Sequence, residues 1–196
     1  MQMQHVNVKL LVHQLEERDL EPLIPVFHGW IREQGLGENS EELLLDVADY
    51  RHVPEGPGVV LIGHEANYSV DNTCNRPGVR YNRKAPLDGS NQDRLRQAAR
   101  AALLACQRLE AEPLLQGKVG FNGQEIELFF NDRLLVPNRD GTRETVQPEL
   151  ETFFQKLFRG GEYSVSYVHE PRELFGVSVK SARAFPVAAL LANLNS

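Results

Sequence analysis

The chain has 196 residues, with 21 Lys and Arg against 27 Asp and Glu, a formal charge of −6 and 41% hydrophobic residues. This length suits one domain or two small packed ones, and the apolar content is enough to bury a core, which excludes a disordered tail, a fibrous repeat and a disulfide-stapled miniprotein. The acidic balance argues against general affinity for nucleic acids, because phosphate binding needs clustered cations in excess.

The sequence carries no membrane or export signal. Residues 1–5 lack the basic region of a signal peptide, and no apolar run approaches the ~20 residues of a spanning helix. Cys74 falls in a turn and Cys106 on an apolar helix face, so free thiols and a cytoplasmic location are expected. With no CxxC or HxxxH spacing, a structural zinc site is not expected.

The first third of the chain predicts a strand, a helix and a hairpin. Residues 6–12 form the strand, and 19–34 form a helix that is regular from about Pro25, since proline is tolerated only in a first turn. The apolar runs 43–47 and 58–63 predict strands covered on both faces, hence central in a sheet. The Pro- and Gly-rich segment between them predicts an antiparallel hairpin.

A second hairpin and the clearest helix follow. Residues 68–72 and 79–83 flank a turn cluster at 73–78, which predicts the hairpin. Ser90 is a good N-cap, with Asp93 three residues later, and it begins a helix over 90–110. The apolar residues of this helix recur at spacings of four and three and form one stripe, namely Leu95, Ala99, Ala102, Cys106 and Leu109.

The last third predicts two strands, a helix and two more strands. Residues 118–121 and 125–131 surround an Asn-Gly pair that is typical of a hairpin turn. A helix is expected over 146–158, and strands over 163–168 and 175–180. The apolar tail 185–194 predicts either a final helical turn or a contact with a partner.

Together these elements predict an α+β fold in which three helices pack on a mostly antiparallel sheet, or sheets, within a single compact domain 1–196. Pro22 and Phe27 match Pro148 and Phe153 in spacing, so the chain also divides into two β-α-β-β modules, 1–85 and 117–182, joined by the helix 90–110. A duplication would place a pseudo-twofold groove between the modules. The alternative is that proline followed by helical periodicity recurs by chance.

The first candidate site is an Asp46–His64 pair. Pairing the first hairpin about its turn places Asp46 opposite Ile62, and His64 then shares a face with Asp46, ~7–8 Å away at Cα. A carboxylate inside an apolar strand needs a partner, and histidine exchanges protons near neutral pH. The pair predicts either an acid–base site, with or without a metal, or a structural hydrogen-bond network.

The second candidate site lies on the second hairpin. Pairing it about its turn places six polar side chains on one face, in the pairs Asp71–Arg80, Ser69–Asn82 and Asn67–Lys84. A face with a carboxylate, amides and cations predicts a small anionic ligand, with Arg83 as a further contact. The alternative is a solvated outer face crossed by salt bridges.

Two functions from different classes fit these patterns. The GxGxxG, GxxxxGK[ST] and GxSxG motifs are absent from the sequence, which removes standard dinucleotide, P-loop and serine-hydrolase sites. The first hypothesis is a non-catalytic cytoplasmic domain that binds a small anion or a protein partner, or forms a homodimer, with no cofactor identified and no nucleic-acid or membrane binding. The second is a hydrolase or isomerase that uses Asp46 and His64 and holds an anion with Arg80, Asn82, Arg83 or Lys84.

Overall fold

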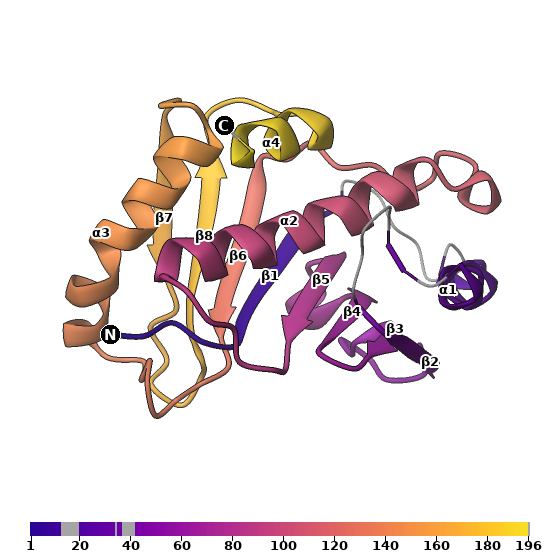
Figure 1. Ribbon diagram of the computed structural model, residues 1–196, viewed down its shortest axis with the longest axis horizontal. Helices are drawn as coiled ribbons and strands as arrows, with labels where there is room; N and C mark the ends of the chain where they lie inside the picture. The colour runs from indigo at the N-terminus through magenta and orange to yellow at the C-terminus, as the bar shows by residue number, and fades with distance from the viewer. Residues whose placement is uncertain (13–19, 34, 37–41, 196) are drawn as a thin grey trace.

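The structure is a computed structural model that describes residues 1–12, 20–33, 35–36 and 42–195. These residues form an eight-stranded antiparallel sheet with helices packed on it (Figure 1). The strands are β1 (Val6–Leu11), β2 (Leu44–Tyr50), β3 (Gly58–Gly63), β4 (Ala66–Asp71), β5 (Gly78–Arg83), β6 (Glu125–Phe130), β7 (Tyr163–Tyr167) and β8 (Phe175–Ser181). The helices are α1 (Leu23–Arg32), α2 (Asn91–Glu110), α3 (Asp140–Leu157) and α4 (Val187–Leu194). The predicted α+β class is confirmed, and α4 is a fourth helix beyond the three expected.

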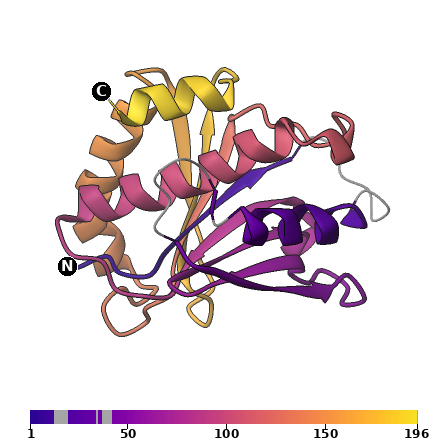
Figure 2. The same ribbon diagram turned by 45° about the vertical axis from the view of Figure 1, so that its right-hand side comes forward.

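The strand order is β2-β3-β4-β5-β1-β6-β8-β7, so the antiparallel pair of β1 and β6 joins the two halves of the chain. The sheet twists strongly, and β2 runs in a clearly different direction from β8 (Figure 2). All four helices lie on the same side, which leaves the other face of the sheet open (Figures 1 and 2). One half supplies strands β1 to β5 and the other β6 to β8, and the predicted duplication is not confirmed by this arrangement.

The helix-covered face of the sheet holds the hydrophobic core. Alternate residues of the strands, such as Val8, Leu61 and Tyr81, are buried there beneath the helices. Helix α2 crosses β1 and β5, and α4 packs against α2 and α3. The apolar stripe predicted for α2 is buried as expected. None of the helices in the described residues is long and apolar enough to cross a membrane.

Helix α2 begins where its sequence predicts. The Ser90 side chain accepts a hydrogen bond from the backbone N–H of Asp93, and the Asp93 carboxylate accepts one from the backbone N–H of Ser90. The hydrogen bonds from Ser90 lower the pKa of Asp93 below its ordinary value. This reciprocal capping box satisfies two amides that the helix itself leaves unpaired.

We expect Ser90→Ala to lower the free energy of unfolding by about 1 kcal/mol, because it removes the acceptor for an N-terminal amide. Urea unfolding followed by circular dichroism measures the change. Ser90→Asn keeps a side-chain acceptor and should retain most of the stability. An equal loss in both variants would show that the cap is not the source of the effect.

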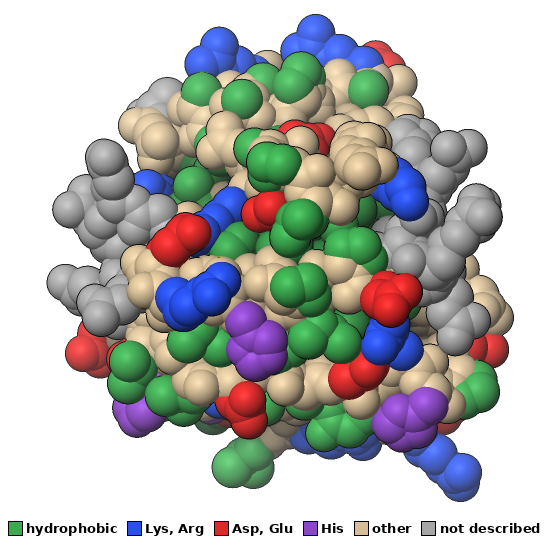
Figure 3. Space-filling view, turned by 90° about the vertical axis from the view of Figure 1, so that its right-hand side faces the viewer, with side chains coloured by type: hydrophobic (Ala, Val, Ile, Leu, Met, Phe, Trp, Pro, Cys, Tyr) green, Lys and Arg blue, Asp and Glu red, His purple; other side chains and the backbone are tan. Residues whose placement is uncertain are grey.

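Strand β2 corrects the prediction that both apolar hairpin strands lie centrally. It is an edge strand, and Leu43 and Leu45 beside and within it are 60% and 50% exposed. The pairing of β2 with β3 shifts its register between Leu44 and Asp46, so side chains of the apolar run do not alternate regularly between the two faces of the sheet. On the side of the molecule that carries α1 and β2, hydrophobic side chains lie between charged ones (Figure 3). A continuous apolar run therefore does not reveal which of its faces is covered.

Two boundaries in the second half also differ from the predictions. Residues 118–121 form no strand, because the backbone N–H of Phe121 donates to the Glu110 side chain at 3.1 Å instead of joining a ladder. Helix α3 begins at Asp140, before the expected residue 146, and carries Pro148 inside it. The apolar period that located this helix starts only at Val146, so the polar first turns carried no signal.

Candidate functional site

The open face of the sheet is polar, yet much of it is buried. Its buried polar side chains are 1% to 8% exposed, namely Asn7, Lys9, Ser69, Asp71 and Glu127. Burying such groups costs free energy unless each finds a partner. The floor of this face must therefore be satisfied by internal pairs or by a bound molecule.

The register of β4 and β5 determines which polar groups are neighbours. Asn67 lies opposite Asn82, and Ser69 lies opposite Arg80, so the predicted pairs are wrong by two residues. The chain reverses at Cys74 and Asn75, which both have positive φ, and not at the Pro-Gly pair that follows. Because a shift of two residues keeps each side chain on its face, the predicted polar face is nevertheless correct for these residues.

Two neighbouring cavities lie over the open face. The first, here called the arginine cavity, has a volume of about 490 Å³, and its wall includes Lys9, Arg76, Arg80, Phe129, Arg133 and Arg172. The second, the amide cavity, has a volume of about 500 Å³, and its wall includes Asn67, Ser69, Asp71 and Asn82. Arg80 and Thr73 line both cavities, so the two adjoin. Each volume suits a small molecule.

Two of the cations in the arginine cavity are neutralised by the protein. Lys9 and Asp71 form an ion pair whose side chains are 2% and 1% exposed. Arg76 binds Glu125 at 2.8 Å and Glu127 at 3.1 Å. The buried carboxylates beneath the cavity are thus bound by Lys9 and Arg76. The other arginines of the wall remain able to bind a ligand.

Arg80 lies at the centre of the site with donors unused. Its Nε is buried and has no hydrogen-bond partner. Its Nη1 is 3.9 Å from the Asp71 carboxylate, which is an ion pair but too long for a hydrogen bond. The guanidinium carbon lies 5.2 Å from the centroid of the Phe129 ring, within the range of a cation–π contact. The ring and the carboxylate hold Arg80 in place and leave its N–H donors available.

Arg133 and Arg172 add positive charge at the rim. Both are exposed, and neither forms an ion pair with a residue that the structure describes. The remaining carboxylate in this wall belongs to Glu173. The cavity thus carries an excess of cations in a chain whose formal charge is −6.

The amide cavity contains unpartnered acceptors. The Oδ1 atoms of Asn67 and Asn82 are buried, and neither accepts a hydrogen bond. Asn7 lies opposite Asn82 on the other neighbouring strand, and neither polar atom of its side chain has a partner. Three amides in one row are therefore left without the hydrogen bonds that buried polar groups require.

The structure places Asp46 opposite Ile62, as the sequence predicts. The Asp46 side chain is exposed and accepts a hydrogen bond from the backbone N–H of Val47 at 2.8 Å. His64 is also exposed, and its backbone N–H donates to Leu43. Among the described contacts none joins the two side chains, and neither residue lines the two cavities.

The other predicted ligand contacts divide into two groups. Asn67, Asp71, Arg80 and Asn82 all line the amide cavity. The two remaining cations do not line either cavity: the Arg83 side chain contacts Glu65 at 2.8 Å and the carbonyl of Ala85, and the Lys84 ammonium donates to the carbonyl of Gly63.

Sequence reasoning missed Lys9, Phe129, Arg133 and Arg172. The first had a signal, because the polar residues of β1 alternate with its valines and leucines and so share one face. The arginines had none, since they lie on loops after β6 and after β7, and only the folded chain brings those loops over the sheet.

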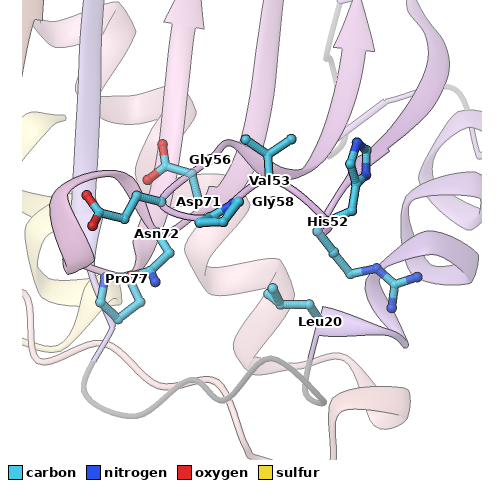
Figure 4. Close-up of a pocket in the computed structure, with 11 residues that line it drawn as sticks. Leu20, His52, Val53, Gly56, Gly58, Asp71, Asn72 and Pro77 are labelled. Carbon is cyan, nitrogen blue, oxygen red and sulfur yellow. The ribbon is translucent and has the colours of Figure 1, made fainter.

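A third cavity, of about 320 Å³, lies where two hairpin turns meet (Figure 4). His52 and Val53 come from one turn, and Asn72 and Pro77 from the other (Figure 4). Its charged groups already have partners within the protein: Asp71 contacts Lys9, Glu55 contacts Asn75, and Arg51 contacts Asp49. The hydrogen bond from Arg51 lowers the pKa of Asp49 to about 2. This cavity offers less unused chemistry than the other two.

In the part of the chain that the structure describes, no group of three or more His, Cys, Asp or Glu side chains is placed to hold a metal ion. A protein partner and a homodimer stay predictions. Comparison of the chain with protein-family models, with curated proteins and with solved structures finds no match.

Proposed function

We propose that the chain is a non-catalytic binding protein for a small organic anion, held in the arginine cavity. The observation that carries this proposal is Arg80, whose buried Nε has no partner although the residue lies between Phe129 and the Asp71 carboxylate. A buried donor without an acceptor costs free energy, and a bound anion would supply the acceptor.

The chemistry of the wall defines the kind of anion. Guanidinium groups bind carboxylates and phosphates through paired hydrogen bonds, and Arg133 and Arg172 lie in the same wall as Arg80. Phe129, Leu174 and Val177 also line this cavity, so part of the ligand is apolar. An alkyl phosphate or carboxylate combines both features.

A cysteine in the cavity wall provides a direct measure of occupancy. Cys74 lines the arginine cavity and is exposed, whereas Cys106 is buried. Burial raises the pKa of the Cys106 thiol well above its ordinary value, so N-ethylmaleimide should label Cys74 alone. Pentyl phosphate, which joins a dianion to a short alkyl chain, should slow the labelling of Cys74. The uncharged 1-pentanol should not.

We expect the double variant Arg133→Gln/Arg172→Gln to bind pentyl phosphate at least about tenfold more weakly, equivalent to about 1.4 kcal/mol. Isothermal titration calorimetry measures the affinity. Arg100→Gln removes one positive charge, half the change made by the double variant, from an exposed position on α2 outside the cavity wall and should leave binding unchanged. The proposal is wrong if pentyl phosphate neither binds nor protects Cys74, or if the Arg100 variant weakens binding equally.

A further inference from the structure

The amide cavity adjoins the arginine cavity at Arg80 and Thr73, so a ligand anchored by its charge extends over the amides. This extension rests on the proposed function, because the anion fixes where the rest of the ligand lies. The wall it would meet differs in chemistry from the arginine cavity, since it presents amide and hydroxyl groups from β4 and β5.

The unpartnered atoms define what the extension carries. The buried Oδ1 atoms of Asn67 and Asn82 are hydrogen-bond acceptors and need donors. An alkyl chain has no donor to offer them. Ligand hydroxyl groups both donate and accept, so they match amide side chains in either orientation. The two asparagines lie directly opposite each other on neighbouring strands, which places their amides close enough for one small molecule to contact both.

The rest of the wall agrees with a hydroxylated ring. Val60, Ile62 and Pro57 supply apolar surface, and Tyr50 is an aromatic residue at the edge of the same cavity. A sugar presents both hydroxyl groups and apolar C–H surface, and such a mixed wall matches both. Among the described residues of this wall, the charged ones besides Arg80 are Asp71, which is paired with Lys9, and Glu55, which accepts a hydrogen bond from the Asn75 amide.

We infer that the ligand is a polyhydroxylated organic anion of the sugar-phosphate class, with its phosphate on the arginines and its hydroxyl groups on Asn67 and Asn82. Contacts with these amides would give the site a specificity for hydroxyl groups that its charge alone does not give. A site that hydrogen-bonds a hydroxyl rejects an analogue without it, since the analogue leaves buried polar groups unpaired.

The test compares two phosphates of equal carbon number. D-Ribose 5-phosphate should bind at least about tenfold more tightly than pentyl phosphate, and should protect Cys74 at lower concentration. Asn67→Ala should remove most of this advantage and leave the affinity for pentyl phosphate unchanged. Asn82→Ala should do the same; if it fails to fold, Asn67→Ala decides the test alone, since both side chains are partly exposed and both line the cavity.

The outcomes separate this inference from the proposed function. If both phosphates bind with equal affinity, or pentyl phosphate binds more tightly, the inference is wrong and the anion site stands. If ribose 5-phosphate is preferred but Asn67→Ala keeps the preference, the amides are not the contacts and the inference is again wrong. If neither phosphate binds or protects Cys74, the proposed function itself fails.

Discussion

Asp71→Ala should lower the free energy of unfolding by about 3–5 kcal/mol, because it leaves the ammonium group of Lys9 buried without its counterion. Lys9 is 1% exposed, and Asp71 is its hydrogen-bond and ion-pair partner. Glu127 lies opposite Lys9 on β6, but Arg76 already binds that carboxylate at 3.1 Å. Urea unfolding followed by the fluorescence of Trp30, the single tryptophan, measures the loss.

The reverse change should cost less. Lys9→Met leaves Asp71 with the Arg80 guanidinium at 3.9 Å and the backbone N–H of Thr73 at 3.3 Å, so the carboxylate keeps two stabilising neighbours. The double variant Lys9→Met/Asp71→Leu should recover much of the stability, since apolar pairs often replace buried ion pairs at no cost. A loss below about 1 kcal/mol in Asp71→Ala would mean that this pair is solvated, as an ordinary surface pair is.

The buried pair of Lys9 and Asp71 is also relevant to the proposed function, because each residue lines one of the two cavities. If an apolar pair is as stable as Lys9 with Asp71, folding alone does not explain why the floor of the open face is charged. The pair contacts both cavities, Lys9 from one wall and Asp71 from the other. Asp71 also lies 3.9 Å from Arg80, which orients the guanidinium beneath the cavity. If the pair serves to position Arg80 for a ligand, that role explains why buried charges occur here, which the stability of the fold alone does not.

The features that depend only on residues close together in the sequence were predictable. The capping residues fixed the start of α2 at Asn91, and the period of its apolar residues identified the buried side. The polar face of β4 and β5 was predictable because side chains alternate in any extended strand. The pairing of these strands was not, because it depends on where the chain reverses, and the positive φ of Cys74 and Asn75 leaves no clear mark in the sequence.

The arrangement of the strands across the sheet was beyond local reasoning. The pair of β1 and β6 joins residues more than a hundred positions apart, since Val8 lies opposite Leu128. That pair determines which polar residues of the two halves meet, and so brings Lys9 beside Glu127 and Phe129 beside Asn7. The cavity walls therefore combine polar strand faces with arginines from loops, and neither the order of the strands nor the position of those loops has a signal within a single segment.

Phe154→Ala should also cost about 3–5 kcal/mol, the usual range when a buried phenylalanine is truncated in a core that cannot collapse around the gap. Phe154 is fully buried on α3, and its ring lies 5.1 Å from that of Phe153, 6.0 Å from Phe158 and 5.9 Å from Tyr163. The variant therefore leaves a cavity among rings that pack on one another. Leu134→Ala, at a site 90% exposed, should change stability by less than about 0.5 kcal/mol.

Phe154→Ala also tests whether the two halves of the sheet unfold together. Phe154 packs beside β7 at one edge, whereas Trp30 lies on α1 beside β2 at the other. If the continuous sheet makes the chain one cooperative unit, Trp30 fluorescence and far-ultraviolet circular dichroism should report the same lowered midpoint. If the fluorescence midpoint stays at its wild-type value while the circular dichroism transition shifts, the halves unfold separately. In that case the pairing of β1 with β6 does not couple them, and the predicted single domain is wrong.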